Sequence, residues 1–350
     1  MYIIHSKSKK SFQSSDFSQE VFIKLPRIPN SLEYRQLFLL PKILAKLNVD
    51  VVHDTYQFGP FFFSKRNHYK KIITVHDVSS FIFRKKEPAY YKRRVLSHYE
   101  IWFRYKIVFK KILSNTDAII SVSNHTKKDL VKYFGIPPDK IYVVYQGIDT
   151  SIFKPYKRRK VKKVKQKYFE DNPTIVLGID SDKTIDNVEV LIQAFLKVKS
   201  RIGDVKLMLI GTPNPAHLSL AKKLGLEKDI LFTGYLPDEE LPLVYNLADV
   251  FVHLSLYEGF GLPPLEAMGC GIPVIASNMS SIPEVVGEAG ILVDPRKPED
   301  VSKKIIQVLE DSDLRRELVE KGLKRSREFT WENTVKSTVQ VYEKILGDKQ

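Results

Sequence analysis

Two glutamates with seven residues between them flank a glycine-containing loop in the second half of the chain. Glu258 opens a loop of sequence Glu-Gly-Phe-Gly, and Glu266 lies in a helix that the prolines at positions 263 and 264 are expected to begin. Proline fits the first turn of a helix, because the amides there lack a helical partner. Free amides and the positive end of a helix favour an anion, most naturally a diphosphate. The sequence therefore predicts an anion site bracketed by two carboxylates.

A carboxylate beside a bound phosphate is repelled by it, so both glutamates need a compensating role. Hydrogen bonds from the hydroxyl groups of a sugar or a ribose would provide one. The alternative is that Glu258 is a solvated loop residue and that Glu266 only complements the helix dipole. We favour the first interpretation, because the glycine loop and the two prolines lie between the two acids.

The elements that position this loop alternate between strands and helices from about Pro173 onward. Apolar runs rich in β-branched residues are typical of buried parallel strands, and segments of helical period lie between them. This alternation predicts a doubly wound α/β domain, which binds ligands at the carboxyl ends of its strands. The predicted strands are 174–178, 206–211, 230–234, 250–254 and 273–276, and the predicted helices are 187–199, 237–247 and 262–268.

The first half of the chain has a similar pattern. It predicts strands at 51–53, 72–76, 118–122 and 141–145, and helices at 32–47 and 125–134. We therefore expect two α/β domains, the first over residues 1–155 and the second over 173–330. A terminal helix within 331–350 is expected to pack back on the first domain. Residues 156–172 are almost continuously basic, and we interpret them as a solvated, flexible linker, with contact to acidic lipid headgroups as the alternative.

Composition excludes several other classes of protein. The single cysteine, Cys270, cannot form an internal disulfide or contribute to a thiol cluster for structural zinc. No apolar run reaches the roughly 18 residues of a spanning helix, and the first residues lack the apolar core of a signal peptide. We therefore expect a cytoplasmic protein, held on the inner face of the membrane at most as a peripheral protein.

The net charge of +15 is distributed unevenly. Residues 1–170 carry 35 Lys and Arg against 13 Asp and Glu, whereas the remaining residues carry 21 against 28. Such asymmetry suggests that the two domains have different partners and that the first is drawn to a polyanion. We do not expect nucleic acid, because no recognised nucleic-acid-binding motif accompanies the charge.

The region around the two glutamates resembles the donor-binding half of the retaining, nucleotide-sugar-dependent glycosyltransferases of family 4, group 1, which have the GT-B fold. The resemblance rests on the spacing of Glu258 and Glu266 and on residues 230–241, 258–277 and 282–295; residues 74–81, 120–130 and 143–149 resemble landmarks of the family's first half. It implies two Rossmann-like domains facing across a cleft. It also implies a metal-independent hexosyltransferase of glycan biosynthesis, with a UDP- or GDP-sugar as donor, no cofactor, and a glycan or lipid-linked acceptor.

The resemblance also implies roles for individual residues. Glu258 would contact hydroxyls of the transferred sugar, and His76 would lie across the cleft near the anomeric carbon; these two are the expected catalytic residues. His76 could instead be an ordinary hydrogen-bonded residue at the end of its strand. The amides of three loop residues would serve the sugar and the diphosphate, and Glu266 would hold the ribose. The expected donor-binding residues are Gly178, Lys183, Gly234, Tyr235, Phe260, Gly261, Leu262 and Glu266, of which Gly234 and Tyr235 would lie near the base.

The sequence departs from the family pattern in two places. The family usually has an Arg directly after the glycine that corresponds to Gly178, and a Lys a few residues later, and both clasp the diphosphate. Here Ile179 follows the glycine, and Ile185 or Asp186 holds the Lys position, so Lys183 is the only nearby cation. The chain also begins at what resembles the second strand of the family, with no glycine before Gly59, which predicts a shortened first domain. These departures motivate an alternative function, a catalytically inactive glycan- or nucleotide-sugar-binding or scaffold protein of the same fold.

Two further segments allow more than one interpretation. The triplet of Asp180, Ser181 and Asp182 has the composition of a metal site, but we favour a solvated turn. Residues 84–114 mix cations with aromatic residues; as a helix, this segment would place Trp102, Phe103 and Ile107 on one face with Leu96 and Tyr99. We favour a helix packed on the core of the first domain, and the alternative is docking on an anionic membrane.

Overall fold

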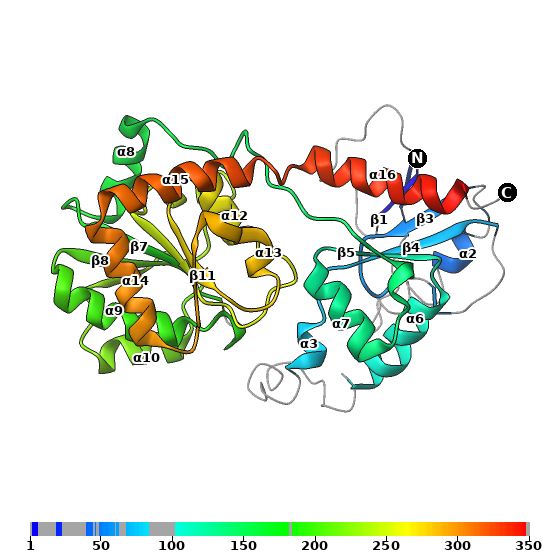
Figure 1. Ribbon diagram of the computed structural model, residues 1–350, viewed down its shortest axis with the longest axis horizontal. Helices are drawn as coiled ribbons and strands as arrows, with labels where there is room; N and C mark the ends of the chain where they lie inside the picture. Colours follow the sequence, from blue (N-terminus) through cyan, green and yellow to red (C-terminus); the bar gives the residue numbers. More distant parts are fainter. Residues whose placement is uncertain are drawn as a thin grey trace.

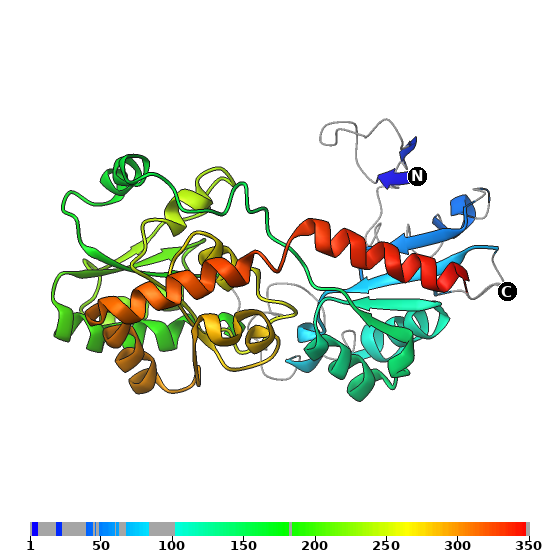
Figure 2. The same cartoon turned by 45° about the horizontal axis from the view of Figure 1, so that its top comes forward.

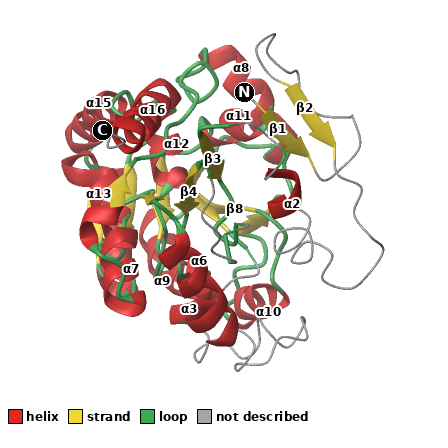
Figure 3. Ribbon diagram, turned by 90° about the vertical axis from the view of Figure 1, so that its right-hand side faces the viewer, coloured by secondary structure: helices red, strands yellow, loops and turns green. Residues whose placement is uncertain are grey.

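The computed structural model describes residues 2–5, 19–22, 40–44, 46, 49–59, 61–62, 68–83, 102–181 and 184–347. Within these ranges the chain forms two α/β domains, each built on its own parallel sheet (Figure 1). In Figure 3 the strands of the two larger sheets lie inside with helices around them, whereas the strand pair of residues 2–5 and 19–22 lies at the edge. The two doubly wound units that the sequence predicts are therefore confirmed.

The first sheet has four parallel strands in the order β3-β4-β5-β6. A separate parallel pair, β1-β2, lies away from this sheet (Figure 2). The strands are β1 (Tyr2–His5), β2 (Gln19–Phe22), β3 (Val51–Asp54), β4 (Lys70–Val75), β5 (Ala118–Ser121) and β6 (Ile141–Val143); the helices are α2 (Leu40–Leu44), α3 (Ser79–Ile82), a π-helical turn (Arg104–Phe109), α6 (Lys110–Asn115), α7 (Asn124–Phe134) and a 3₁₀ turn (Pro138–Lys140).

The second sheet has six parallel strands in the order β12-β11-β10-β7-β8-β9. Alternate residues of its buried strands face opposite layers: Val176 and Val250 pack toward α9 and α14, whereas Leu177 and Phe251 pack toward α11 and α12. The strands are β7 (Thr174–Ile179), β8 (Val205–Ile210), β9 (Ile230–Phe232), β10 (Val250–His253), β11 (Val274–Ser277) and β12 (Ile291–Val293); the helices are α8 (Arg158–Tyr168), α9 (Val188–Ile202), α10 (Pro215–Lys223), α11 (Leu241–Tyr245), α12 (Leu262–Gly269), α13 (Ile282–Val286), α14 (Pro298–Glu310), α15 (Ser312–Ser326) and α16 (Trp331–Gly347), with 3₁₀ turns at Thr184–Asp186 and Gly287–Ala289.

Two stretches of chain connect the two domains, and they lie against each other. Ile148 and Thr330 form an isolated parallel bridge, and the amide of Ile148 donates to the carbonyl of Phe329 at 3.0 Å. A Cβ added at Gly147 would lie 2.2 Å from the carbonyl carbon of Thr330, so only glycine permits this approach. The second crossing continues into α16, which runs back over the first sheet (Figure 1).

Helix α16 is held on the first sheet by apolar and polar contacts. Its residues Val341 and Ile345 are buried with residues of β4 and β5. His53 of β3 lies 2.6 Å from the hydroxyl of Tyr342 through Nδ1 and 2.8 Å from the hydroxyl of Thr74 through Nε2. Hydroxyls on both sides suit a neutral ring, because each can donate or accept.

Some segments differ from the sequence-based expectations. The basic segment that we interpreted as a flexible linker forms helix α8, and its Val164 is buried in the core of the second domain. In the segment 84–114, residues 84–101 lie outside the described ranges. In its described part, Trp102, Phe103 and Ile107 are 44%, 53% and 44% exposed, so this set is not core-packed as we expected. Tyr105, Phe109 and Ile112 form the buried face instead.

None of the helices in the described ranges is both long and apolar enough to cross a lipid bilayer.

We expect acid to weaken the docking of α16 through His53. Burial, with a smaller contribution from His76, lowers the pKa of His53 from 6.5 to about 4. Between pH 6.5 and about 4, His53 is therefore protonated in the unfolded chain but neutral in the folded protein. The free energy of unfolding decreases as the pH falls through this range, by up to roughly 3 kcal/mol. Urea unfolding across this range should show a steeper decline for the wild type than for His53→Gln. His68→Gln, which changes an exposed histidine, is the control; equal slopes for wild type and His53→Gln would contradict the assignment.

Candidate functional site

The loop between β10 and α12 contains two glycines with different structural reasons. Gly261 has a φ of 121° and precedes the first residue of α12, so it turns the chain in a conformation that side chains rarely adopt. Gly259 lies against the first domain, where an added Cβ would be 1.9 Å from the carbonyl oxygen of His76. Gly259 therefore permits the close approach of the two domains, and Gly261 lets α12 begin.

The start of α12 presents a set of unused donors. Within the described parts of the chain, the amides of Phe260, Gly261 and Leu262 have no hydrogen-bond acceptor. The ring of Phe260 is buried between the domains, near the rings of Tyr145 and Phe329. Because the side chain is fixed there, the amides stay at the helix end, where they can bind an anion.

Glu258 is held from several directions. Its Oε1 accepts from Nε2 of His253 at 3.0 Å, and its amide donates to the hydroxyl of Ser280 at 2.9 Å. The hydroxyl of Ser281 donates to its carbonyl at 2.9 Å. Ser280 has a φ of 55°, an uncommon conformation for a residue other than glycine that is often found at functional sites. The carboxylate therefore has a fixed orientation beside the free amides.

Glu266, which lies in α12, contacts helix α11. The hydroxyl of Tyr245, which is fully buried, donates to Oε2 of Glu266 at 2.9 Å. Burial raises the pKa of Glu266, although the hydrogen bond from Tyr245 opposes this shift. Burial and the nearby carboxylate raise the pKa of Tyr245, so this phenol remains a donor. The arrangement keeps one acceptor group in place in a mostly apolar setting.

The carboxyl end of β7 lacks the cations of the family pattern. Ile179 packs against the core, and the carbonyl of Ile185 accepts from the amide of Leu256 at 2.7 Å. Gly178 is explained by packing, because an added Cβ would lie 2.7 Å from Cδ2 of Leu191. Lys183, the nearest cation in the sequence, lies outside the described residues, as does Asp182.

Asp180 corrects one of our interpretations. It is only 1% exposed, and its Oδ1 lies 2.8 Å from Nδ1 of His217, so it is not part of a solvated turn. A buried carboxylate requires such a partner, since its desolvation is costly. No group of three or more His, Cys, Asp or Glu side chains in the described ranges is arranged to hold a metal ion.

Gly234 and Tyr235 both follow β9, and Gly234 forms an isolated bridge with Gly211, which follows the neighbouring strand β8. The carbonyl of Gly234 accepts from the amide of Gly211 at 3.0 Å, and Gly234 has a φ of 72°. Tyr235 is 81% exposed, so its ring is available to a flat ligand. Among the described residues, no hydrogen bond joins Gly234 or Tyr235 to Glu266.

His76 follows β4 and faces the donor loop through its main chain. Its Nε2 donates to the carbonyl of Thr55 at 2.9 Å, and its Nδ1 lies 3.3 Å from the side-chain amide of Gln146. Because a carbonyl only accepts, this contact places the ring proton on Nε2. The structure thus brings His76 to the loop of Glu258 while fixing its ring on the first domain.

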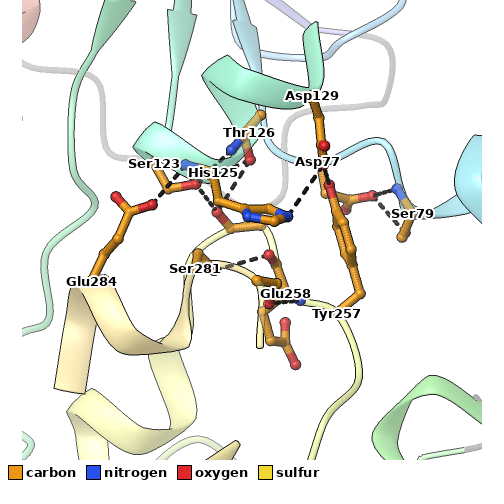
Figure 4. A network of polar contacts seen from close by, with 12 residues as sticks. Asp77, Ser79, Ser123, His125, Thr126, Asp129, Tyr257, Glu258, Ser281 and Glu284 are labelled. Atoms are coloured by element: carbon orange, nitrogen blue, oxygen red, sulfur yellow. Dashed lines mark hydrogen bonds and ion pairs between the residues drawn. The ribbon is translucent and has the colours of Figure 1, made fainter. Parts of the chain in front are cut away.

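Helix α7 forms the other side of the contact between the domains (Figure 4). The hydroxyls of Ser123 and Thr126 donate to the carbonyl of Gly259, at 2.7 and 3.3 Å. The carboxylate of Glu284, from α13, accepts from the amides of Asn124 and His125 at 2.8 and 2.6 Å. A carboxylate at the positive end of a helix is favourable, so this contact holds the domains together.

The residues that join the domains at α7 were not identified from the sequence. Ser123 and Glu284 lie in segments that matched the family landmarks, but nothing in one sequence indicates that they meet across the domains. The available signal was local: a Ser before a helical pattern predicts an N-cap, and the hydroxyl of Ser123 does accept from the amide of Thr126.

Comparisons with known proteins agree with this geometry. Residues 4–152 match the family model "Glycosyltransferase Family 4", and residues 160–325 match "Glycosyl transferases group 1". The chain is 32% identical over 288 residues to O-antigen chain mannosyltransferase B of Escherichia coli, covering 81% of this chain and 73% of that protein. It is 30% identical over 241 residues to the serotype-specific mannosyltransferase WbdA of Escherichia coli, covering 67% of this chain but only 29% of WbdA.

Solved structures share the fold. Sucrose-phosphate synthase from Thermosynechococcus elongatus superposes with a TM-score of 0.79 at 21% identity, covering 99% of this chain and 89% of that one. HepE of Anabaena, solved in complex with UDP-glucose, superposes with a TM-score of 0.68 at 20% identity, covering 88% and 81%. The chain belongs to the group 1, family 4 glycosyltransferases and has the GT-B fold.

We expect Gly259→Ala to separate the domains locally. The added methyl group would meet the carbonyl oxygen of His76, and relieving this overlap should cost about 1–3 kcal/mol. Hydrogen exchange should then become faster at the amides of Asn124 and His125, which Glu284 protects in the closed arrangement. Gly347→Ala, at a position with open space around it, is the control. Unchanged protection in Gly259→Ala would contradict the close approach.

Proposed function

We propose that the protein is a retaining glycosyltransferase that moves a hexose from a nucleoside-diphosphate sugar to a glycan or lipid-linked acceptor. The observation that carries this proposal is the set of free amides at the start of α12, directly beside the fixed carboxylate of Glu258. Two relatives that are named mannosyltransferases support a hexose as the transferred group. The UDP-glucose in the HepE complex supports a nucleotide sugar as the donor.

In this proposal the second domain binds the donor. The amides of Phe260, Gly261 and Leu262 hold the diphosphate, and the positive end of α12 takes the place of a metal ion. Glu258 accepts hydrogen bonds from hydroxyls of the sugar, and Glu266 accepts them from the ribose. Gly234 and the exposed ring of Tyr235 lie beside the base.

The first domain completes the site from the other side. His76 lies next to Gly259 and therefore near the reacting carbon of a sugar bound at Glu258. The positive charge that develops on the sugar is stabilised by surrounding dipoles and by the departing diphosphate. With Ile179 and Ile185 in place of cations, Lys183 is the side chain of β7's loop that we assign to the diphosphate charge.

We expect Glu258→Gln and Glu266→Gln to have different effects. Loss of the Glu258 carboxylate should lower kcat by about 10²–10³-fold, because its contacts strengthen in the transition state. Loss of the Glu266 carboxylate should mainly weaken donor binding, by about tenfold. Titration calorimetry with UDP- and GDP-sugars and product detection with membrane extract would measure both effects. Glu170→Gln, at an exposed position, is the control.

Other outcomes of the same experiment are informative. Transfer that persists in a metal chelator is expected; its loss would contradict the role given to α12. No binding of any nucleotide sugar to the wild type would favour the alternative, an inactive scaffold or glycan-binding protein of this fold. The observation that favours this alternative is the loss of both cations of the family pattern, with Ile179 at the Arg position and Ile185 or Asp186 at the Lys position.

We also place the protein on the inner, anionic face of a membrane, where a lipid-linked acceptor would lie. Trp102, Phe103 and Ile107 are exposed, and the adjacent Lys110 and Lys111 are exposed as well. Aromatic residues at the headgroup level and cations beside them are typical of interfacial helices.

We expect the protein to sediment with anionic vesicles at low salt and to be released at high salt. The double variant Trp102→Ser and Phe103→Ser should bind less than the wild type, because it removes the inserted aromatic rings. The double variant Lys162→Gln and Lys163→Gln in α8 is the control, since in Figure 1 this helix lies in the other domain, far from α6. Equal binding to neutral vesicles, or no binding, would contradict the proposal.

A further inference from the structure

Tyr257 belongs to the second domain by sequence but to the first domain by packing. It directly precedes Glu258, yet its side chain is 5% exposed within the apolar cluster of the first domain. Its ring lies 5.9 Å from the ring of Phe83 and 5.4 Å from that of His125, both in edge-on geometry. The donor loop is therefore anchored in the neighbouring domain by a buried aromatic residue.

The phenol of Tyr257 has a specific partner there. It donates to Oδ2 of Asp129 on α7 at 2.6 Å, and the same oxygen lies 3.3 Å from Nε2 of His125 (Figure 4). A hydrogen bond from a buried hydroxyl to a carboxylate is short and strong. Burial and the carboxylate raise the pKa of Tyr257, so the phenol keeps its proton at ordinary pH.

The residues on either side of Glu258 are bonded to the same helix. Tyr257 binds Asp129 of α7, and the carbonyl of Gly259 accepts from Ser123 and Thr126 at the start of α7. The contacts of Glu258 to His253, Ser280 and Ser281 lie within the second domain. The residues on either side of Glu258 are thus bonded to the first domain, whereas Glu258 is bonded to the second.

Separation of the domains would break these contacts together. Tyr257 would have to leave an apolar core, and both its hydroxyl and the carboxylate of Asp129 would lose their partner. The backbone on both sides of Glu258 would then be released. A group bonded at only one of two places can move by about 1 Å, which is enough to slow a reaction strongly.

We propose that Tyr257 is a positioning residue that couples closure of the domains to the orientation of Glu258, with Asp129 as its partner. This inference rests on the proposed function, because it concerns the catalytic use of Glu258. In the open protein the amides of α12 bind the donor and Glu258 keeps its contacts to His253, Ser280 and Ser281, but the residues on either side of it lack their contacts to α7. Closure inserts Tyr257, fixes the backbone on both sides of Glu258 and excludes water from the sugar.

Tyr257→Phe tests this proposal, because it removes the hydrogen bond and keeps the ring. We expect the Kd for the donor to stay within about twofold of the wild type and kcat for transfer to fall at least about tenfold. The fraction of donor lost to hydrolysis should rise, since the site closes less completely. Asp129→Asn should behave similarly, and the double variant should be no worse than either single one, because both remove the same interaction.

Tyr69→Phe is the matched control, because Tyr69 is a buried tyrosine of the same cluster, and no hydrogen bond joins it to the loop among the described residues. It should match the wild type in both transfer and hydrolysis. Wild-type kcat in Tyr257→Phe would overturn the proposal. So would a loss of donor affinity and of kcat in parallel with a fall in Tm, since that result indicates a purely structural role.

A measurement without substrate separates this proposal from the proposed function. Hydrogen exchange in residues 255–262 and at the start of α7 should become faster together in Tyr257→Phe, and unchanged exchange would overturn the coupling. If the wild type binds no nucleotide sugar while the two segments still exchange together, the proposed function fails. In that case the mechanical coupling between the domains stands, but its catalytic purpose is overturned.

Discussion

The close approach of Gly259 to the first domain is the constraint on which the site depends. With no side chain at this position, the loop comes within reach of the His76 carbonyl and of the hydroxyls of Ser123 and Thr126. The two residues that we assign to catalysis then lie at one junction, with Glu258 and the helix start on one side and His76 on the other. Gly259 belongs to the loop that we assign to ligand binding, but the structure requires a glycine there because of the contact between the domains.

Much of the second domain could be predicted because its signals are local. The strand expected at 174–178 is β7 (Thr174–Ile179), and the helix expected at 262–268 is α12 (Leu262–Gly269). Buried parallel strands are short apolar runs, and Gly-x-Gly followed by two prolines ends one element and begins the next. The same local logic identified Glu258 and the free amides beside it, which the structure places together.

The remaining features depend on contacts that periodicity does not encode. Asp180 reads as a turn residue until His217 of α10 is brought against it. Trp102 and Phe103 read as core until Tyr105 and Phe109 are seen to occupy the core instead. Tyr257 gives no sign that it packs in the other domain. In each case the burial of a side chain is decided by a segment far away in sequence, on which a local pattern is silent.

The paired crossings at Ile148 and Thr330 limit how the two domains can move. A single covalent connection would allow the halves to twist and slide in many directions, whereas two adjacent connections joined by a hydrogen bond leave mainly rotation about one axis. Gly147 lets the two segments touch, so a bulkier residue there would loosen the pivot without altering either half. The trajectory along which Tyr257 meets α7 is therefore set by these two connecting segments, whose residues Ile148 and Phe329 pack in one cluster with Phe260 of the donor loop.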